Sequence, residues 1–403
     1  MPCIVIKGIQ VAPYIIMHSD LSLLFRVESR QISTGIIQGC FTSIPVIAVN
    51  GVRTPEQGEA LLAEGTQDFV SLGRALLADP EWVAKAADGR EGEIRRCISC
   101  LWCIEALEAN AQKGEPVECA VNPRTGRETE RVAPREDGAG RTVVVAGAGP
   151  AGLSAAEILG RRGFKPVVLE SDSGPGGQLR LASVPPGKDK IEWCFEDLEA
   201  AALREGAEIR YGCEATPSLI ESLDPYAVVV ATGGAPVVPR VPGVELENVC
   251  TVNDVLGGAV KVEGERVAVI GAGMTGLETA EKLAADGNRV IVVEMAARLG
   301  PGVYFQNLED VLSRLAQYDP EYITSHRLMR IEPGAIMLEH VKTRASLERK
   351  VDRIVLAVGV RSEHRLALEL KSCRRPVKVV GDARRPGRIA CAVRDGFDAA
   401  WYL

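Results

Sequence analysis

Four cysteines in the first third of the chain have a spacing that suits an iron-sulfur cluster. The segment CISCLWC contributes Cys97, Cys100 and Cys103, and Cys119 follows in PVECAVNP. Thiolates separated by two residues lie on one side of a tightly turning loop, and a distant fourth cysteine completes the ligand set. Structural zinc sites more often use two separated Cys-x-x-Cys pairs. The spacing therefore favours a [4Fe-4S] cluster, with structural zinc and unliganded cysteines as the alternatives.

Two glycine-rich segments repeat one pattern. RTVVVAGAGPAGLSAAEILGRRGFKPVVLE and ERVAVIGAGMTGLETAEKLAADGNRVIVVE read as copies of the same unit. Each copy has three glycines and a later acid, namely Gly147, Gly149, Gly152 and Glu170, and then Gly271, Gly273, Gly276 and Glu294. Each glycine run lies between a β-branched stretch and an amphipathic helical pattern. Together the copies predict two dinucleotide-binding sites.

The chemistry of such a site needs these residue types. Glycine permits the tight turn and lets backbone amides approach a pyrophosphate at the positive end of the next helix. Glu170 and Glu294 can accept hydrogen bonds from the hydroxyls of an adenosine ribose. Either carboxylate would repel a 2′-phosphate by about 4 kcal/mol at a separation of about 4 Å. We therefore expect FAD or NADH rather than NADPH, and the alternative for the second copy is a fold without a ligand.

The elements that position these residues are also visible in the sequence. Apolar stretches that end in glycine follow each fingerprint, at residues 227–234 and 354–359. A last strand is expected in VKVVGDA, residues 377–383, and a helix from Arg388 to the C-terminus. Upstream, PVIAVNG, PEQGEALLAEG and DFVSLGR read as strand, helix and strand.

The N-terminal strands end in residues that suit a phosphate site. Gly51 follows the first strand, and Gly73 and Arg74 follow the second. In a (β/α)₈ barrel, the loops after the last two strands commonly bind phosphate at the C-terminal face. Arg74 would act there as a charge-assisted donor.

The duplicated fingerprint resembles the flavin and pyridine-nucleotide disulfide oxidoreductase superfamily. The resemblance implies that an NAD(H)-binding domain, residues 251–360, is inserted into an FAD-binding domain made of residues 141–250 and 361–403. It also places Gly381 and Asp382 against the FAD ribityl chain and Gln178, in GGQL, near the flavin. The nucleotide domains contain no Cys-x-x-Cys pair, which argues against a dithiol reductase of the thioredoxin reductase type.

Together with the cysteines, the run GRALLADPEWVAKAADGREGEIRRCISC resembles the family of 2,4-dienoyl-CoA reductase, 2-enoate reductase and trimethylamine dehydrogenase. The expected fold is therefore α/β, with two nested Rossmann-like domains preceded by the last two βα units of a barrel, residues 44–95, and an iron-sulfur loop with its linker, residues 96–140. The resemblance implies electron flow from NADH through FAD and the cluster to an FMN that reduces an activated C=C bond. Cys119 lies farther from Cys103 than is usual in the family.

The length of the N-terminal part departs from the family. Fewer than one hundred residues precede Cys97, whereas a (β/α)₈ barrel needs about 250. Residues 1–43 stay unassigned, no catalytic residue is identified, and FMN is not expected to bind without a partner. We interpret the chain as a truncated product or as half of a split enzyme whose barrel-containing partner supplies the missing strands. The alternatives are an electron-transfer subunit that serves a partner protein and a non-functional remnant.

Composition limits the remaining function classes. A length of 403 residues predicts two or three domains. A net charge of -7 with 4% aromatic residues argues against nucleic-acid binding. The N-terminus lacks the features of a signal peptide, and the uncharged stretch 31–52 contains several polar residues. We therefore expect a cytoplasmic enzyme that acts on a small molecule and has no contact with membranes.

Overall fold

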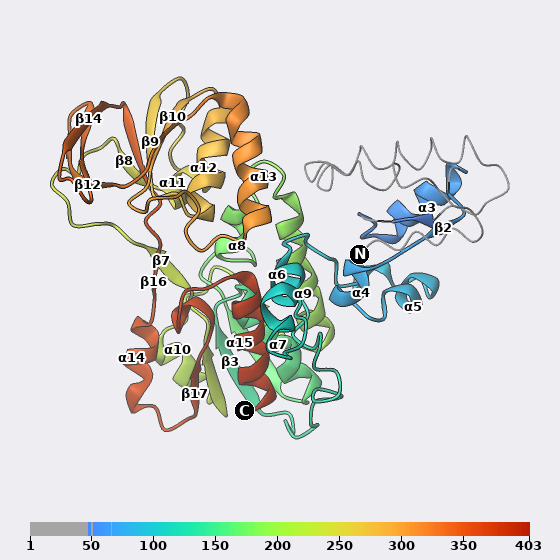
Figure 1. Ribbon diagram of the computed structural model, residues 1–403. Coiled ribbons are helices and arrows are strands. Elements are labelled where there is room, and N and C mark those ends of the chain that lie inside the picture. Colours follow the sequence, from blue (N-terminus) through green and yellow to red (C-terminus); the bar gives the residue numbers. More distant parts are fainter. Residues whose placement is uncertain (1–46, 50, 66) are drawn as a thin grey trace.

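The computed structural model describes residues 47–49, 51–65 and 67–403 (Figure 1). The unassigned segment 1–43 and the start of the predicted barrel region, residues 44–46, lie outside the described residues. The described chain forms two nucleotide-binding units and a small N-terminal unit that projects to one side (Figure 1). The expected α/β class, with two Rossmann-like units after a short barrel fragment, is confirmed.

The first nucleotide-binding unit has a five-stranded parallel sheet in the order β17-β6-β3-β4-β5. Its strands are β3 (Thr142–Ala146), β4 (Lys165–Leu169), β5 (Glu208–Arg210), β6 (Ala227–Val230) and β17 (Val377–Val379). β17 comes from the C-terminal segment. The sheet is therefore built from strands that precede the second unit in the sequence and from one strand that follows it. Val143 to Ala146 are fully buried, as expected for a parallel sheet covered on both faces.

The helices of the first unit come from both segments of the chain. They are α7 (Pro150–Arg161), α8 (Gln178–Ala182), α9 (Glu192–Arg204), α10 (Pro217–Ser222), α14 (Arg365–Glu369) and α15 (Ile389–Trp401), with short 3-10 turns η3 (Asp189–Ile191), η5 (Leu370–Ser372) and η6 (Gly381–Ala383). α7 and α15 cross in close contact, because a Cβ added at Gly396 would lie 1.9 Å from the Ala151 carbonyl oxygen. Ser154 Oγ also donates to the Val393 carbonyl at 2.8 Å.

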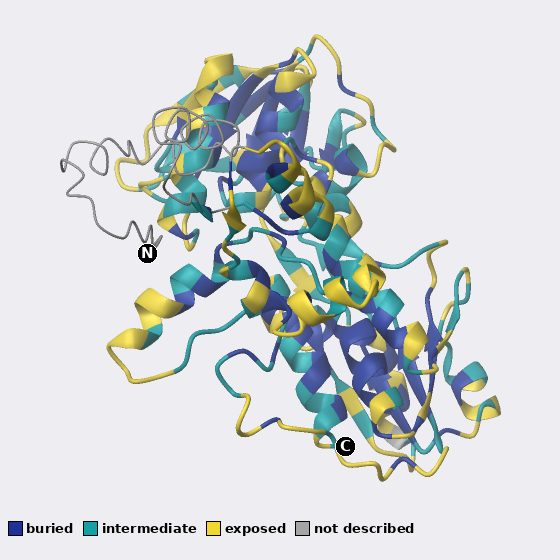
Figure 2. Cartoon of the chain, turned by 90° about the vertical axis from the view of Figure 1, so that its right-hand side faces the viewer, coloured by how far each residue is buried: buried dark blue, intermediate teal, exposed yellow. Residues whose placement is uncertain are grey.

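The second nucleotide-binding unit has its own parallel sheet in the order β11-β10-β9-β15-β8. Its strands are β8 (Val249–Thr251), β9 (Arg266–Ile270), β10 (Arg289–Val293), β11 (Glu321–Ile323) and β15 (Arg353–Leu356), and its helices are α11 (Val252–Leu256), α12 (Met274–Ala285) and α13 (Phe305–Leu315), followed by η4 (Ala316–Tyr318). An antiparallel meander of β12 (His326–Glu332), β13 (Ala335–His340) and β14 (Ser346–Lys350) packs on one side. The sequence analysis did not predict this meander. Figure 2 shows the buried strands as two separate cores.

A short antiparallel ribbon joins the two units. The chain leaves the first unit through β7 (Gly234–Pro236) and returns through β16 (Val360–Ser362). The two crossings pair with each other, Val360 with Pro236 and Ser362 with Gly234.

The N-terminal unit follows the strand-helix-strand order that the sequence predicts. β1 (Ile47–Ala48) pairs in parallel with β2 (Phe69–Val70), and α3 (Pro55–Ala63) connects them. Thr54 and Gln57 form a capping box at the start of α3, which fixes where the helix begins. α4 (Arg74–Ala78), α5 (Trp82–Ala87) and the turn η2 (Glu91–Glu93) complete the unit. Among the described residues, β1 and β2 pair only with each other.

Partly buried ion pairs attach the cysteine segment to the first nucleotide-binding unit. Arg95 contacts Glu157 of α7 at 2.5 Å, and Glu157 also pairs with Arg161 at 2.9 Å. Arg96 binds Asp197 of α9 through its backbone amide and its guanidinium, at 2.7 and 2.6 Å. Successive residues immediately before Cys97 are thus fixed to two different helices. In the described part of the chain, no helix is long and apolar enough to cross a membrane.

The pairing of Arg95 with Glu157 leads to a test of stability. Burial raises the pKa of Glu157, but the charges of Arg95 and Arg161 outweigh it and hold the pKa below its ordinary value. Because Glu157→Gln removes the carboxylate that contacts the largely buried Arg95 directly, we expect a loss of about 3 kcal/mol at pH 7 in urea unfolding. A depressed pKa gives stability that is complete above the unfolded value and lost as the pH falls through the folded one. The gap to wild type should therefore narrow below about pH 4.

Glu208→Gln is the control, because Glu208 forms an exposed pair with Arg210. It should change stability by less than about 0.5 kcal/mol. An equal loss in both variants would show that Glu157 has no special role.

Candidate functional site

The first glycine turn has the shape that the fingerprint predicts. β3 ends at Ala146, and Gly147 then takes a φ of +109°, a conformation that favours glycine. A Cβ at Gly152 would lie 1.9 Å from the Gly147 carbonyl oxygen, so no side chain fits there. Gly149 differs from both, because an added Cβ would meet nothing within 4 Å. It stands at the N-terminus of α7 and faces open space.

The second turn reproduces this geometry. Gly271 has a φ of +107°, and a Cβ at Gly276 would lie 2.0 Å from the Gly271 carbonyl oxygen. Gly273, at the N-terminus of α12, again has nothing within 4 Å of an added Cβ. In both units the fold itself requires the first glycine, for its positive φ, and the third, for the carbonyl oxygen that lies beside it. The middle glycine leaves room beside the helix N-terminus, where phosphate groups bind favourably.

The two acids lie next to their turns. Glu170 Oε2 accepts the Ala148 amide at 2.6 Å, and Oε1 accepts the Asp172 amide at 2.9 Å. Glu294 accepts the Ala272 and Ala296 amides at 2.8 and 2.7 Å in the same way. Both carboxylates are buried. An ionised carboxylate accepts about four hydrogen bonds, so each acid keeps acceptor capacity for a ribose.

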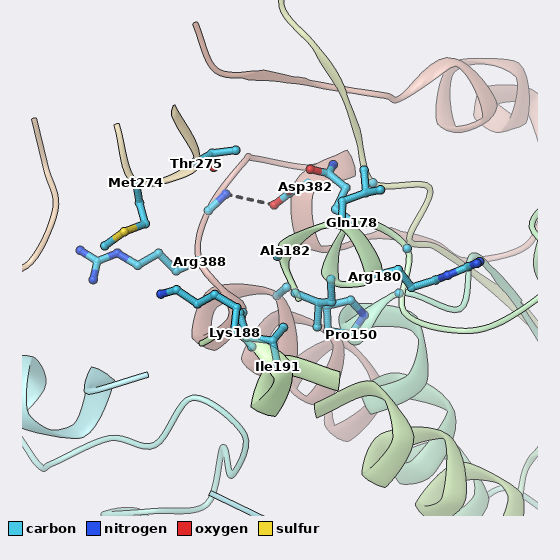
Figure 3. Close-up of a pocket in the computed structure, with 18 of the residues that line it drawn as sticks. Pro150, Gln178, Arg180, Ala182, Lys188, Ile191, Met274, Thr275, Asp382 and Arg388 are labelled. Atoms are coloured by element: carbon cyan, nitrogen blue, oxygen red, sulfur yellow. Dashed lines mark hydrogen bonds between the residues drawn. The ribbon is translucent and has the colours of Figure 1, made fainter. Parts of the chain in front are cut away.

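One large cavity connects the two turns. Its volume is about 2370 Å³, and its walls include Gly149 of the first unit and Met274 and Thr275 of the second. Ser99, Cys100 and other residues of the cysteine loop also line it. Figure 3 shows Gln178 and Asp382 on one side and Met274 on the other, with the side chains of Arg388 and Lys188 below Met274 in this view. The structure thus brings the first glycine turn, Met274 and Thr275 of the second turn, and the cysteine loop to one space, whereas the glycines of the second turn and Glu294 do not line it.

The residues expected near the flavin lie in the first unit's part of this cavity. Gln178 begins α8 and donates from Nε2 to the Gly234 carbonyl at 2.9 Å. Asp382 accepts the Gly387 amide at 3.0 Å, and burial raises its pKa. Gly381 has a φ of +61°, and its added Cβ would lie 2.8 Å from Ala151 Cβ, which brings this turn close to α7.

The four cysteines of the proposed cluster lie close together. The Cys100 thiol interacts electrostatically with Cys97, Cys103 and Cys119. Burial raises the pKa of Cys100 to about 12 and that of Cys119 to about 11, while backbone amides donate to both sulfurs. Such amide donors stabilise thiolates and are typical of iron-sulfur sites. α6 (Trp102–Ala111) begins between Cys100 and Cys103.

The loop around these cysteines is strained. Ser99 and Leu101 have φ values of +59° and +60°, which cost about 1 to 2 kcal/mol for residues other than glycine. Among the described residues, Ser99 Oγ is buried without a hydrogen-bond partner. Four thiols with backbone amide donors are the groups that an iron-sulfur cluster needs. In the described part of the chain, however, no group of three or more His, Cys, Asp or Glu residues is arranged to hold a metal ion.

The other described cysteines differ in exposure. Cys194 and Cys250 are buried, Cys213 and Cys373 are half-buried, and Cys391 is exposed. Cys3 and Cys40 lie outside the described residues.

The sequence analysis missed one arginine, Arg53, which the structure places beside the residues predicted to bind phosphate. Gly51 has a φ of +94°, Gly73 precedes α4, and Arg74 lines the large cavity. Arg53 lines the same cavity and is only 7% exposed. Its position shortly after a strand-terminating Asn-Gly pair was the available signal.

Two contacts between units were also missed, because they join residues far apart in sequence. Lys188 of the first unit pairs with Glu278 of α12 at 2.5 Å. Arg388 pairs with Glu105 of α6, and its guanidinium carbon lies 5.1 Å from the Trp102 ring centroid. Lys188, Glu278 and Arg388 all line the cavity. No sequence pattern indicates these two pairings.

Comparison with protein families assigns the chain to known groups. Residues 141–382 match the pyridine nucleotide-disulphide oxidoreductase family. Residues 24–93 match the NADH:flavin oxidoreductase / NADH oxidase family.

Individual relatives have both parts in the same order. NADH oxidase of Thermoanaerobacter brockii is 38% identical over 367 residues, which cover 90% of this chain and 56% of that protein. Cinnamate reductase of Clostridium sporogenes is 28% identical, with coverage of 89% and 53%. The chain thus spans about half the length of the curated relatives it matches.

A solved structure agrees with these matches. A 2-naphthoyl-CoA reductase in complex with 2-naphthoyl-CoA superimposes with a TM-score of 0.87 at 25% identity, over 93% of this chain and 56% of that one. The chain therefore belongs to the pyridine nucleotide-disulphide oxidoreductase family and, with its N-terminal match, is a flavoprotein oxidoreductase of the 2,4-dienoyl-CoA reductase and trimethylamine dehydrogenase group.

Proposed function

We propose that this chain accepts reducing equivalents from NADH and delivers them, by way of FAD and a [4Fe-4S] cluster, to an FMN site that reduces activated C=C bonds. The observation that supports this most directly is the shared cavity. The first glycine turn, Met274 and Thr275 of the second turn, and the cysteine loop border it, so bound groups would share one space. When bound, FAD exchanges a hydride with NADH and the cluster carries single electrons.

The first unit has the groups needed to hold FAD. Gly149 leaves the N-terminus of α7 open to a pyrophosphate, and Glu170 keeps acceptor capacity for the adenosine ribose. Asp382 and Gln178 border the part of the cavity toward the second unit. A carboxylate at Asp382 accepts hydrogen bonds from hydroxyl groups such as those of a ribityl chain.

The second unit has the matching groups for NADH. Gly273 and Glu294 have the same roles at α12 that Gly149 and Glu170 have at α7. The ion pair between Lys188 and Glu278 holds the start of α12 against the first unit. It thereby positions the nicotinamide end of the cavity relative to the flavin end.

The substrate class is inferred from relatives. The names cinnamate reductase and 2-naphthoyl-CoA reductase denote reduction of a conjugated carboxylate and of an aromatic thioester. We propose an activated unsaturated acid, thioester or enone as the final acceptor. Gly51, Gly73 and Arg74 would hold the FMN phosphate only in a completed barrel, because two strands do not close one.

A partner that completes this barrel is the second part of the proposal. β1 and β2 pair only with each other in the described residues, and Phe69 of β2 and Val83 of α5 are more than half exposed. The edges of a two-stranded sheet with exposed apolar side chains favour docking against further strands. The nine described cysteines are all free, which supports a reducing, cytoplasmic location.

A matched pair of glycine variants tests the two nucleotide sites. Because an added Cβ at Gly149 or Gly273 has no protein atom within 4 Å, Gly149→Val and Gly273→Val should leave the fold unchanged and fill the pyrophosphate space instead. Gly149→Val should lose FAD, measured as flavin absorbance after anaerobic purification. Gly273→Val should retain FAD, but NADH should no longer bleach the flavin in stopped-flow.

The reverse pattern, or retention of both activities, would contradict the assignment of the two turns. Circular dichroism of both variants serves as the control for folding. A wild-type chain without FAD would contradict the proposal as a whole.

The preference for NADH is tested by removing one charge. Glu294→Gln keeps an acceptor for the Ala272 amide but no longer repels a 2′-phosphate. We expect the ratio of kcat/KM for NADPH to that for NADH, measured with an artificial acceptor, to rise at least about tenfold. Glu170→Gln is the matched control in the other unit and should leave this ratio unchanged. Equal ratios in wild type and Glu294→Gln would show that Glu294 does not face the ribose.

A further inference from the structure

One ion pair joins the two nucleotide-binding units directly. Lys188, just before η3 in the first unit, contacts Glu278 of α12, with 2.5 Å between Nζ and Oε1. Both residues line the cavity, and in Figure 3 the Lys188 side chain lies below Met274, the first residue of α12. Within the described residues, no other ion pair connects the first unit to the second.

The other contacts between these two units are weaker. Arg388 of the first unit donates to the Gly302 carbonyl at 3.4 Å. Where α8 and α11 touch, a Cβ added at Gly257 would lie 3.6 Å from Leu181 Cδ2, which is ordinary van der Waals contact. Of these contacts the ion pair is the shortest, and it alone joins two full charges.

The ribbon that links the units has a glycine at each end. Gly233 precedes β7 on the side of the first unit, and Gly359 precedes β16 on the side of the second. Their φ values are +74° and +106°, and a Cβ added at either would meet nothing within 4 Å. Glycines at the ends of elements absorb large changes of φ and ψ. The ribbon, which lies between the units in Figure 1, therefore allows the second unit to swing with its own sheet intact.

The ion pair balances two opposing contributions. Glu278 is 7% exposed. Burial raises its pKa, whereas the nearby charge of Lys188 lowers it. When two charges leave water to form a pair, the loss of hydration offsets much of their attraction. A pair of this kind forms and breaks with a modest net change in free energy, which suits a contact that opens and closes.

We propose that Lys188 and Glu278 form a latch, which sets the fraction of molecules in which the second unit is closed against the first. In the closed arrangement the start of α12 borders the same cavity as Gln178 and Asp382. In the open arrangement the second unit has swung away about the ribbon, and the dinucleotide is exchanged. Lys188 and Glu278 are thus positioning residues, and their effect on hydride transfer rests on the proposed function.

The first measurement follows closure without turnover. The full chain with bound FAD is compared by hydrogen-deuterium exchange as wild type, Lys188→Met and Glu278→Gln. The amides of α8 and α11 touch across the closed interface, so they should exchange at least about threefold faster in both variants. Lys282→Met is the matched control, because Lys282 pairs with Asp286 inside α12. Exchange at α8 and α11 should be unchanged in this control.

The second measurement is flavin reduction by NADH in stopped-flow. Each single variant should lower the limiting rate at least about fivefold, and the double variant by no more than about twofold further, because either substitution already breaks the pair. The half-saturating NADH concentration should change by less than about twofold. Gly273 and Glu294 belong to the second unit and hold the dinucleotide in both arrangements.

Two results would overturn the latch: wild-type exchange in both single variants, or a double variant whose rate falls by the product of the single effects. Faster exchange with an unchanged limiting rate overturns its role in hydride transfer. Because Glu278 belongs to the second unit, Glu278→Gln decides the question if Lys188→Met binds less FAD. A wild-type chain without FAD refutes the proposed function, and exchange at α8 and α11 then still supports or overturns the latch.

Discussion

The close approach of a helix to the turn before it is the constraint on which both nucleotide-binding units depend. In each unit a carbonyl oxygen occupies the place where a Cβ would stand at the third glycine, 1.9 Å away at Gly152 and 2.0 Å at Gly276. This contact fixes the angle at which α7 and α12 leave their strands. The acid at the end of the next strand then binds an amide of the same turn. Helix start, turn and acid thus form one rigid group.

Much of this arrangement could be predicted because the information is local. Glycines, β-branched runs and a terminal acid recur at fixed spacing, and the resulting strand-turn-helix needs few distant contacts. The start of α3 was predictable for the same reason, since Pro55 and the capping residues around it are adjacent in sequence. Local patterns of this kind determine local structure reliably.

The unpredicted parts depend on residues that are far apart in the chain or on weak patterns. Arg95 and Glu157 are separated by 62 residues, and Arg388 and Glu105 by 283. No spacing rule connects such partners. β12 and β13 were missed because their burial does not alternate cleanly, and β12 has a register shift between Leu328 and Arg330. β14 alternates between exposed and half-buried residues, but four of its five residues are polar or charged. Arg53 was missed because a single arginine in a loop carries no motif.

The paired crossings β7 and β16 have a consequence for how this architecture arose. Both connections to the second unit leave and enter the first unit side by side, hydrogen-bonded to each other from Gly234 to Pro236 and from Val360 to Ser362. A domain whose two ends are adjacent can be inserted or exchanged without changing the path of its host. The second unit therefore has the form of an inserted domain, whose replacement by another domain would leave the sheet of the first unit intact.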